Sequence, residues 1–442
     1  MKVITYGTFD LFHEGHYNIL KRAKDLGDYL IVGVTSENFD KCRGKLNVKQ
    51  SLVERIENVK KSGLADEIIV EEYTGQKIDD IKRFNVDKFV IGSDWLGKFD
   101  YLNEYCDVIY LERTKGVSST QLRNEKRGIL NIGCVGAGRI ANRMIKESKY
   151  VSGVNFDIVF GRNEEHIKDF AIKNELKEYT MDYDEFLSRV DAVYIATPHV
   201  THYDLAKKAL NAGKHVICEK PMTLSESQTK ELFELAEKNG LVLYDAIKTA
   251  YVTAFKRLIV IAKSGNIGNI RDVDATFTKL VHDKSLREYD LNQGGGSLNE
   301  LIAYPLIAIF KLLGIDYNDI DFFTFRDEET GIDLYTKILF QYDDALATAN
   351  VGLGVKKEGE LIIAGTEGYI YVPAPWWKTE YFEIRYENQN LNEKYFFKFD
   401  GDGLRYELVE FYLSIVNNTK NNFIKDEESI AISKVIEEFS KI

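Results

Sequence analysis

The first 125 residues alternate between two hydrophobic patterns. Short runs such as 29–34 (YLIVGV) are almost continuously apolar, which is typical of a strand buried on both faces of a parallel sheet. Between such runs, segments such as 17–26 repeat their apolar residues at helical spacing. Strands are predicted at 2–6, 29–34, 67–70, 88–91 and 108–111, and helices at 17–26, 50–62 and 76–83. This alternation predicts an α/β fold with a doubly wound, Rossmann-like parallel sheet.

The alternation begins again near residue 129. Strands are predicted at 130–135, 156–160 and 192–196, and another ends at Glu219. The region 270–400 is rich in further strands, at 272–279, 334–340 and 345–351, and amphipathic helices follow at 403–415 and 427–440. We divide the chain into domains 1–127, 128–248 and 249–442. The charged segment 121–128 is short, and we expect it to continue a helix of the first domain.

Composition narrows the class of protein. A net charge of -12 leaves no basic surface for nucleic acid. The four cysteines lie far apart without a CxxC pair, so we expect reduced thiols and neither disulfides nor a zinc site. The N-terminus lacks a signal-peptide pattern, and no apolar run approaches the ~18 residues of a membrane span. We therefore expect a cytoplasmic protein with no nucleic-acid or membrane partner.

Two segments of the first domain have the chemistry of phosphate sites. The motif HEGH places His13 and His16 three residues apart where a glycine turn leads into a helix. Two imidazoles there can donate hydrogen bonds to a phosphoryl group during an in-line displacement. Alone, the pair would be interpreted more readily as ordinary histidines near a helix start. The segment 113–120 (RTKGVSST) adds a cation, a glycine and three hydroxyls before a helix, which favours a second phosphate cradle.

GTFDLFHEGH, SDWLGKFD at 93–100 and RTKGVSST occur in the order found in glycerol-3-phosphate cytidylyltransferases, and residues 1–125 resemble that family. The resemblance implies that His13 and His16 stabilise the transition state at the α-phosphate of CTP, which enters with Mg²⁺. It implies catalytic contacts from Lys45 and Arg113, and nucleotide or substrate contacts from Thr8, Phe9, Asp10, Arg55, Asp94, Thr114, Ser118, Ser119 and Thr120. Ser93 and residues 73–75 depart from the family pattern, so the acceptor stays open among small keto- and polyol phosphates.

A dinucleotide-binding pattern follows the first domain. The sequence GAGRIA at 136–141 stands between a predicted strand and a helix, with a second strand about 20 residues on. That second strand ends at Gly161-Arg162-Asn163. A carboxylate there would bind the ribose hydroxyls of NAD, whereas Arg162 suits a 2′-phosphate. We expect NADP(H), with NAD possible; the alternative is that Arg162 is a solvated surface residue.

A third motif places Glu219, Lys220 and Pro221 at the end of a strand, where a cation can polarise a carbonyl beside a nicotinamide. With GAGRIA, SGNIGNIR at 264–271 and GGGSLNELIAYP at 294–305, it makes residues 129–442 similar to the Gfo/Idh/MocA oxidoreductases. The resemblance implies a large open, mostly antiparallel C-terminal sheet, a dimer or tetramer, and catalytic roles for Lys220 and Tyr304. Cofactor contacts are expected from Gly136, Gly138, Arg139, Ile140, Arg162, Thr197, Pro198, His202 and Glu219.

The two resemblances together favour a bifunctional enzyme. One domain would join CMP to a small keto- or polyol phosphate such as dihydroxyacetone phosphate, with release of pyrophosphate. The other would reduce the keto group with NAD(P)H, giving a CDP-activated polyol such as CDP-glycerol for surface polysaccharides. The alternative is a cytidylyltransferase with a non-catalytic, nucleotide-sensing oxidoreductase domain. The order of the steps stays open, as does the role of 369–377 (YIYVPAPWW), a substrate loop or plain packing.

Overall fold

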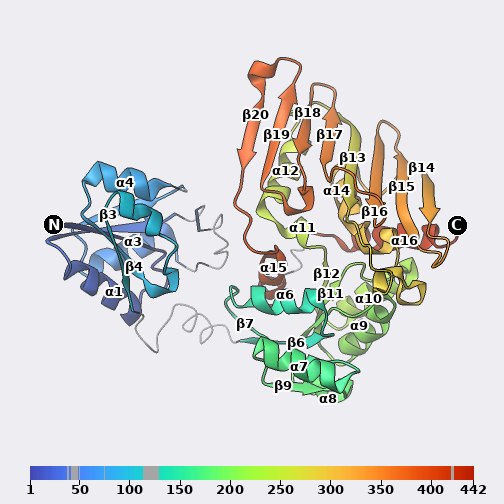
Figure 1. Ribbon diagram of the computed structural model, residues 1–442, viewed down its shortest axis with the longest axis horizontal. Helices are drawn as coiled ribbons and strands as arrows, with labels where there is room; N and C mark the ends of the chain where they lie inside the picture. Colours follow the sequence, from blue (N-terminus) through green and yellow to red (C-terminus); the bar gives the residue numbers. More distant parts are fainter. Residues whose placement is uncertain (37–38, 41–47, 49, 74, 113–128, 420–422) are drawn as a thin grey trace. The chain divides into compact units, whose positions relative to one another are not determined.

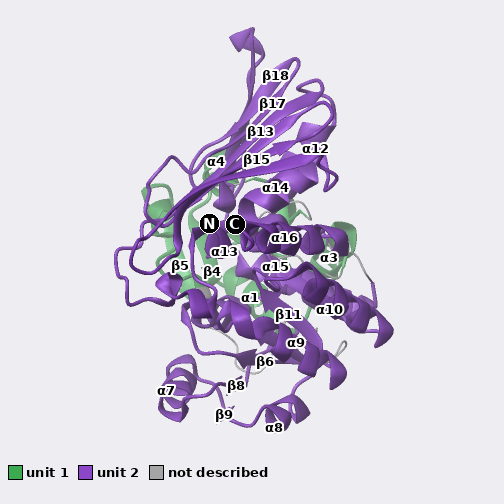
Figure 2. Cartoon of the chain, turned by 90° about the vertical axis from the view of Figure 1, so that its right-hand side faces the viewer, with its two compact units in different colours: residues 1–129 green, residues 130–442 purple. Residues whose placement is uncertain are grey.

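The computed structural model describes residues 1–36, 39–40, 48, 50–73, 75–112, 129–419 and 423–442 of the 442-residue chain. The described chain forms two compact units, Met1–Ile129 and Leu130–Ile442 (Figure 2). The helix expected over 121–128 lies outside the described residues.

The first unit is built on a five-stranded parallel sheet with the strand order β3-β2-β1-β4-β5 (Figure 1). Its strands are β1 (Lys2–Gly7), β2 (Tyr29–Thr35), β3 (Glu67–Glu71), β4 (Lys88–Gly92) and β5 (Asp107–Leu111). Its helices are α1 (Glu14–Lys24), α3 (Leu52–Lys61) and α4 (Gln76–Phe84), with 3-10 turns η1 (Ser93–Trp95) and η2 (Asp100–Glu104). One core packs Leu20 of α1 and Val59 of α3 against the sheet, and a second packs Ile81 of α4. The sheet therefore has helices on both faces, which confirms the doubly wound prediction.

Helix α1 begins three residues before the predicted start at residue 17. His13 is its N-cap, and the His13 side chain accepts a hydrogen bond from the main-chain N–H of Gly15. A side-chain acceptor at this position satisfies one of the N–H groups that the first turn leaves open. The polar residues Glu14 and His16 are therefore helical, although they carry no apolar periodicity.

The second unit begins with a parallel sheet of the order β12-β11-β10-β6-β8-β9, with β7 paired to β6. Its strands are β6 (Leu130–Val135), β7 (Val154–Asn155), β8 (Ile158–Phe160), β9 (Glu178–Thr180), β10 (Ala192–Ile195), β11 (His215–Glu219) and β12 (Leu243–Ala246). The helices are α6 (Arg139–Ser148), α7 (Glu164–Asn174), α8 (Tyr183–Ser188), α9 (His202–Asn211) and α10 (Glu226–Lys238), with the turn η3 (His199–Thr201). This sheet confirms the predicted Rossmann domain.

An eight-stranded sheet follows, with the order β14-β15-β16-β13-β17-β18-β19-β20. The strands are β13 (Ile270–Thr278), β14 (Asp319–Arg326), β15 (Asp333–Gln341), β16 (Leu346–Gly352), β17 (Leu361–Gly365), β18 (Gly368–Val372), β19 (Tyr381–Tyr386) and β20 (Glu393–Phe396). Every pairing is antiparallel except that of β13 with β16, as the predicted mostly antiparallel sheet requires.

Helices connect the two sheets of this unit (Figure 1). They are α11 (Lys248–Tyr251), α12 (Thr253–Lys263), α13 (Ser297–Leu301), α14 (Ala303–Leu313), α15 (Leu404–Asn417) and α16 (Asp426–Phe439), with 3-10 turns η4 (Arg287–Tyr289), η5 (Leu291–Gln293), η6 (Trp376–Lys378) and η7 (Gln389–Leu391). The last two helices return to the Rossmann domain: Arg405 of α15 pairs with Glu147 of α6, and Ser433 of α16 hydrogen-bonds Thr229 of α10.

Within the described ranges, no single helix has the length and apolarity of a membrane span; Leu291–Leu301 and Ala303–Leu313 reach that limit only together, bent by 44°. Nearly all residues of α14 are buried inside the protein.

Candidate active sites

In the first unit, the strand order changes direction between the neighbouring strands β1 and β4: β2 and β3 follow on one side of β1, and β4 and β5 on the other. Ligands of open α/β sheets bind beyond the carboxyl ends of the strands at such a switch point. The predicted Thr8, Phe9 and Asp10 follow β1 directly. Phe9 (φ 52°) and Leu11 (φ 47°) have left-handed backbone conformations that side chains other than glycine rarely adopt. Such conformations persist where surrounding contacts enforce them, and they often mark functional turns.

The two predicted catalytic histidines lie against each other at the start of α1. The rings of His13 and His16 are stacked, with centroids 3.9 Å apart and planes inclined by 21°. His13 accepts the Gly15 N–H through Nδ1, at 3.0 Å, so the neutral ring carries its proton on Nε2. That tautomer can donate to a phosphate oxygen, and the adjacent helix N-terminus favours an anion. The structure thus brings together the pair that the motif predicted.

Arg55 supports this turn from beneath. Its side chain is fully buried, and Nη1 donates to the carbonyl oxygens of Thr8 and Thr35, each at 2.9 Å. It also forms an ion pair at 3.1 Å with the equally buried Asp40, which accepts hydrogen bonds from the Thr8 and Thr35 hydroxyls. These contacts tie the ends of β1 and β2 together. A contact of Arg55 with substrate or nucleotide remains a prediction.

Several predicted residues of this site cannot be placed. Lys45, Arg113, Thr114, Ser118, Ser119 and Thr120 lie outside the described residues. Asp94 belongs to the turn η1 immediately after β4, at the same edge of the sheet as Thr8. The second phosphate cradle therefore remains a prediction.

The second unit contains a cavity of about 880 Å³ at the carboxyl end of its Rossmann sheet. Its lining includes every predicted cofactor residue of this unit and both predicted catalytic residues, which are Gly136, Gly138, Arg139, Ile140, Arg162, Thr197, Pro198, His202, Glu219, Lys220 and Tyr304. These residues come from the ends of several strands and from α14, so the fold gathers into one space groups that the chain separates by as many as 168 positions.

The glycine turn fits the diphosphate of a dinucleotide. Gly136 has φ +100°, and a Cβ atom there would lie 2.7 Å from the carbonyl oxygen of Ala196, so only glycine suits the turn. Gly138 is the N-cap of α6 and provides no side-chain cap, and no acidic side chain occupies the first turn. The N–H groups of this helix end therefore face the cavity without a side-chain acceptor, as an anion site requires.

The turn after β8 provides the adenosine end of such a site. Arg162 lines the cavity, and Asn163 caps α7 by accepting from the His166 N–H at 2.9 Å. Residues 161–163 contain no carboxylate. His166 also lines the cavity, with Nε2 3.1 Å from the carbonyl oxygen of Ala137. His166 was not predicted as a site residue, because it lies in α7, outside the glycine motif. Only the folding of α7 against the glycine turn brings it into the site.

Lys220 lines the cavity and follows the last residue of β11. Its Nζ donates to the main-chain oxygen of Glu300 at 2.8 Å and lies 5.9 Å from the ring centroid of Tyr304. Tyr304 is largely buried, and this burial raises the pKa of its hydroxyl well above the usual value. The phenol is therefore a proton-bearing hydrogen-bond donor at neutral pH, and Lys220 is the cation beside it.

Glu219 and His202 are more deeply buried than Lys220. The Glu219 carboxylate accepts from the Tyr194 hydroxyl at 2.6 Å, and burial raises its pKa. His202 has ring nitrogens 2.9 Å from the carbonyl oxygens of Thr197 and Pro221, so it joins the turns after β10 and β11. Both line the cavity, where cofactor contact remains a prediction.

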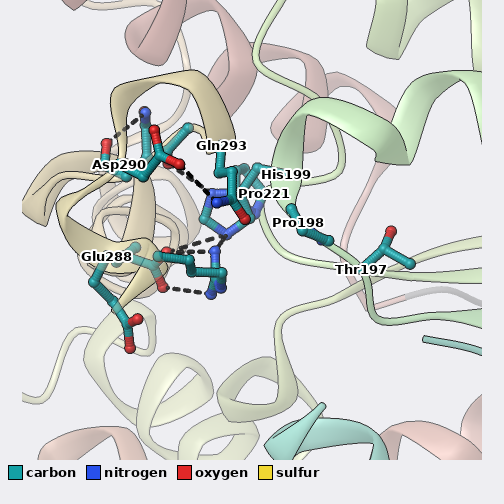
Figure 3. Close-up of polar contacts among 12 residues, drawn as sticks. Thr197, Pro198, His199, Pro221, Glu288, Asp290 and Gln293 are labelled. Atoms are coloured by element: carbon teal, nitrogen blue, oxygen red, sulfur yellow. Dashed lines mark hydrogen bonds and ion pairs between the residues drawn. The ribbon is translucent and has the colours of Figure 1, made fainter. Parts of the chain in front are cut away.

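A polar group of His199, Arg287 and Glu300 lines the cavity together with Lys220, and of its members only Glu300 belongs to a predicted motif, at 294–305. His199 Nδ1 is 3.0 Å from the Gly294 carbonyl, and Arg287 forms an ion pair with Glu300 at 2.7 Å. Burial, together with Lys220 and Arg287, lowers the pKa of His199 well below its usual value. The ring is therefore neutral with its proton on Nδ1, and Nε2 faces Arg287 Nη1 at 3.5 Å. Figure 3 shows His199 between the Pro198 turn and the segment of Glu288 and Asp290. The sequence pattern did not predict that His199 and Arg287 join Glu300, because the three residues come from η3, η4 and α13.

The two tryptophans of 369–377 have different surroundings. Trp376 is fully buried, and its indole N–H donates to the Thr276 carbonyl at 2.8 Å. Trp377 instead lines the cavity, stacked on Phe277 with ring centroids 3.6 Å apart. Packing accounts for the first tryptophan, and the second belongs to the site.

Fold and sites together define an enzyme with two nucleotide-dependent domains. Residues 4–125 match the cytidylyltransferase-like family, residues 130–246 the NAD-binding Rossmann fold of the GFO/IDH/MocA oxidoreductase family, and residues 255–371 the GFO/IDH/MocA C-terminal domain. The chain belongs to the cytidylyltransferases through its first unit and to the GFO/IDH/MocA oxidoreductases through its second. Both predicted resemblances are confirmed.

Individual relatives cover the two units separately. Glycerol-3-phosphate cytidylyltransferase of Bacillus spizizenii is 52% identical over 129 residues, which are 28% of this chain and 95% of that protein. Trans-1,2-dihydrobenzene-1,2-diol dehydrogenase of Bos taurus is 27% identical over 71% of this chain and 96% of that enzyme. The crystal structure of KijD10, a 3-ketoreductase from Actinomadura kijaniata in complex with NADP and TDP-benzene, covers 70% of this chain and 96% of that one, with a TM-score of 0.63 and 21% identity.

Proposed function

We propose that this protein is a bifunctional enzyme that makes a CDP-activated polyol, such as CDP-glycerol, from CTP, a small keto- or polyol phosphate and NAD(P)H. The observation that carries the proposal is that one chain holds a stacked histidine pair at a phosphate-binding switch point and, in a separate unit, a lysine beside a dinucleotide turn. The acceptor we favour is dihydroxyacetone phosphate, because it offers both a phosphate and a ketone. The likeness of the first unit to glycerol-3-phosphate cytidylyltransferases supports a three-carbon acceptor.

In the first unit, a phosphate oxygen of the acceptor attacks the α-phosphorus of CTP. The bond from that phosphorus to the oxygen bridging to the β-phosphate breaks, and pyrophosphate leaves with Mg²⁺. Negative charge increases on the α-phosphoryl oxygens in the transition state. His13 and His16 donate hydrogen bonds to those oxygens, and the N-terminus of α1 adds N–H groups and a partial positive charge. Lys45, Arg113, Thr114 and the hydroxyls of Ser118, Ser119 and Thr120 would hold the triphosphate.

In the second unit, the residues present fit a dinucleotide. The uncapped start of α6 would hold the diphosphate, and Arg162 would pair with a 2′-phosphate, which favours NADP(H) over NAD. When bound, the reduced nicotinamide supplies the hydride that converts the ketone carbon into an alcohol carbon. Lys220 donates a hydrogen bond to the ketone oxygen and then the proton that completes the hydroxyl. The buried Tyr304 hydroxyl orients the same oxygen as a second donor.

The wider setting follows from this chemistry. A CDP-activated polyol is a donor for surface polysaccharides, and we assign both reactions to the cytoplasm, where CTP and NADPH are available. We also propose a homodimer or homotetramer, and three domains, 1–127, 128–248 and 249–442, of which the last two form the second unit.

The proposal is tested with the purified full chain, CTP, Mg²⁺, NADPH and a panel of triose to hexose ketose phosphates, with mass analysis of the CDP-linked products. We expect one ketose phosphate to give pyrophosphate, NADP⁺ and a CDP-polyol. His16→Ala should abolish pyrophosphate release without changing NADPH binding, and Lys220→Ala should abolish NADPH oxidation without changing cytidylyl transfer. NADPH that binds but is never oxidised would indicate the non-catalytic, nucleotide-sensing alternative.

A further inference from the structure

The cavity of the second unit is more cationic than the protein that surrounds it. Its lining contains eight cationic and four acidic side chains, in a chain whose net charge is -12. The cations are Arg139, Arg143, Arg162, Lys220, Lys248, Lys279, Arg287 and Lys378, and the acids are Asp204, Glu219, Glu288 and Glu300. Two acids are paired already, Glu288 with Arg139 and Glu300 with Arg287. The excess of four positive charges is about what the diphosphate and the 2′-phosphate of NADP(H) carry together, so only the position of the cations can indicate a second anion.

Three of these cations converge on one residue, Asp402, two on its carboxylate and one on its main-chain oxygen. Lys378 Nζ lies 3.2 Å from Asp402 Oδ1, and Arg143 Nε lies 3.7 Å from Oδ2. Lys248 Nζ donates to the main-chain oxygen of Asp402 at 2.8 Å. We call Arg143, Lys248 and Lys378 the cation group. Its members come from α6, α11 and η6, so three elements far apart in sequence position the charges together.

Lys248 shows that the group is not an ordinary surface cluster. Its side chain is 7% exposed, and burial, with Lys378 nearby, lowers its pKa although Glu407 opposes the change. Glu407 is fully buried as well, and its burial raises its own pKa well above the usual value. A buried amine beside two other cations, with one shared aspartate, gains most from an added anion.

The cation group lies near Lys220, the residue proposed to contact the ketone oxygen of the substrate. Lys220 follows the last residue of β11 and Lys248 lies two residues beyond the end of β12, and these two strands are paired through Glu219 and Ala246. Both lysines line the cavity, and both act on the carboxyl of Glu219, whose pKa each of them lowers, so one substrate can reach both amines with its ketone and its phosphate. Trp377, next to Lys378 in the chain, lines the cavity beside them with Phe277. An aromatic surface next to a phosphate site suits a nucleobase.

We infer that the cation group binds the diphosphate of a CDP-linked ketose, so that cytidylyl transfer precedes reduction. This inference rests on the bifunctional activity proposed above and decides the order of its two steps. A diphosphate diester carries two negative charges, which match three cations less the one charge of Asp402. A free ketose phosphate shares the phosphate-ester chemistry but has no diphosphate bridge and no base for the Trp377 surface.

Steady-state NADPH oxidation by the full chain tests the inference, with CDP-dihydroxyacetone and dihydroxyacetone phosphate as separate substrates. Arg143→Ala and Lys378→Ala should each raise KM for CDP-dihydroxyacetone by about tenfold, which corresponds to about 1.4 kcal/mol. The values of kcat and of Kd for NADPH should stay within about twofold. Lys378→Arg should restore most of the affinity, and Asp402→Asn should lower KM, because it removes the competing carboxylate. The control is Lys149→Ala, whose surface ion pair with Glu175 lies outside the cavity.

The opposing outcomes are distinct. Equal losses of NADPH affinity in the variants would assign the cation group to the cofactor and overturn the inference. So would unchanged KM values in Arg143→Ala and Lys378→Ala, or a clear preference of the unmodified enzyme for dihydroxyacetone phosphate, and in both cases the bifunctional activity would stand. If the unmodified enzyme oxidises NADPH with neither of these substrates, nor with any ketose phosphate of the panel or its CDP derivative, both proposals are rejected.

Discussion

At the scale of single residues, the protein buries charges where they organise its sites. The pair of Arg55 and Asp40 lies against the turn after β1 in the first unit, with both side chains fully buried. Taking two charges out of water is costly, and removing one partner leaves the other uncompensated. The pair therefore acts on the geometry of Thr8 and its neighbours, because Arg55 holds the carbonyl oxygen of Thr8.

We predict that Asp40→Ala destabilises the first unit by about 3 kcal/mol, the usual cost of an unpaired buried charge. The measurement is hydrogen exchange by mass spectrometry across a urea series, with peptides from the first unit compared with peptides from the second. Lys149→Ala, which breaks an exposed ion pair, is the control and should change stability by less than about 1 kcal/mol. A similarly small effect of Asp40→Ala would show that the buried pair is dispensable for folding.

The buried carboxyl of Asp245 should make the free energy of unfolding depend on pH. Burial raises the pKa of its carboxyl to about 7, and Glu219 adds to the rise, whereas Ser429 and Lys220 oppose it. An unfolded aspartate titrates near pH ~3.9, so between these values the folded chain keeps a proton that the unfolded chain has lost. Unfolding then releases a proton, and stability falls as pH rises from about 4 to 7. Asp245→Asn should match the unmodified protein near pH 4 and exceed its free energy of unfolding by about 3–4 kcal/mol at pH 8.

Urea unfolding at a series of pH values measures this difference. Asp182 provides a comparison of opposite sign, because it accepts hydrogen bonds from the N–H groups of Glu185 and Asp184, which lower its pKa. Its contribution to stability should be present above pH ~4 and lost as pH falls through its folded pKa. A gain for Asp245→Asn that does not vary with pH would contradict the assigned titration.

At the scale of elements, both units contain a strand that is joined by a tight turn to the N-terminus of a helix, β1 to α1 and β6 to α6. In the first unit His13 caps α1 and, with His16, occupies the mouth of the site. In the second unit Gly138 leaves the start of α6 without a side-chain cap. Under the proposed function, the start of α1 provides donors for a reacting phosphoryl group, and the start of α6 is left open for a diphosphate that does not react.

The two glycines of the α6 turn should respond differently to substitution: Gly136→Ala should lower stability, whereas Gly138→Ala should weaken only NADPH binding. A Cβ at Gly136 would lie 2.7 Å from the Ala196 carbonyl in a left-handed conformation, so the variant should unfold more easily and lose NADPH binding. Gly138 has φ −81°, and its Cβ would stand 3.9 Å from the same carbonyl. Gly138→Ala should keep its stability within about 0.5 kcal/mol, because only cavity space is occupied. It should nevertheless raise Kd for NADPH by about tenfold. Thermal unfolding and fluorescence titration measure the two quantities, and equal behaviour of the variants would refute the distinction.

At the scale of the whole molecule, the two sites belong to separate compact units. The second unit is closed by its last two helices, which return to the Rossmann domain through pairs such as Arg405 with Glu147. Each unit therefore has its own core and its own site within the described chain. Under the proposed function, the CDP-linked intermediate passes between sites through solvent.

An equimolar mixture of His16→Ala and Lys220→Ala should therefore make the CDP-polyol that neither variant makes alone. Each variant keeps one intact site, and the diffusing intermediate connects them. The measurement is product formation by mass analysis against the unmodified enzyme at the same site concentration. No product from the mixture, with both partial activities intact, would mean that the intermediate does not leave the chain that formed it.

The sequence by itself determined the class of each domain, because its determinants are local. Strand and helix periodicity, the HEGH spacing and the GAGRIA turn all act over a few residues, and so the sheets and the glycine turn could be read from the chain. The start of α1 was missed because a histidine cap, and not apolar periodicity, sets it. Only the tertiary structure decided the composition of the oxidoreductase site. His199, Arg287 and the cation group come from distant elements whose register depends on the packing of two sheets, and burial then lowers the pKa of His199 and of Lys248.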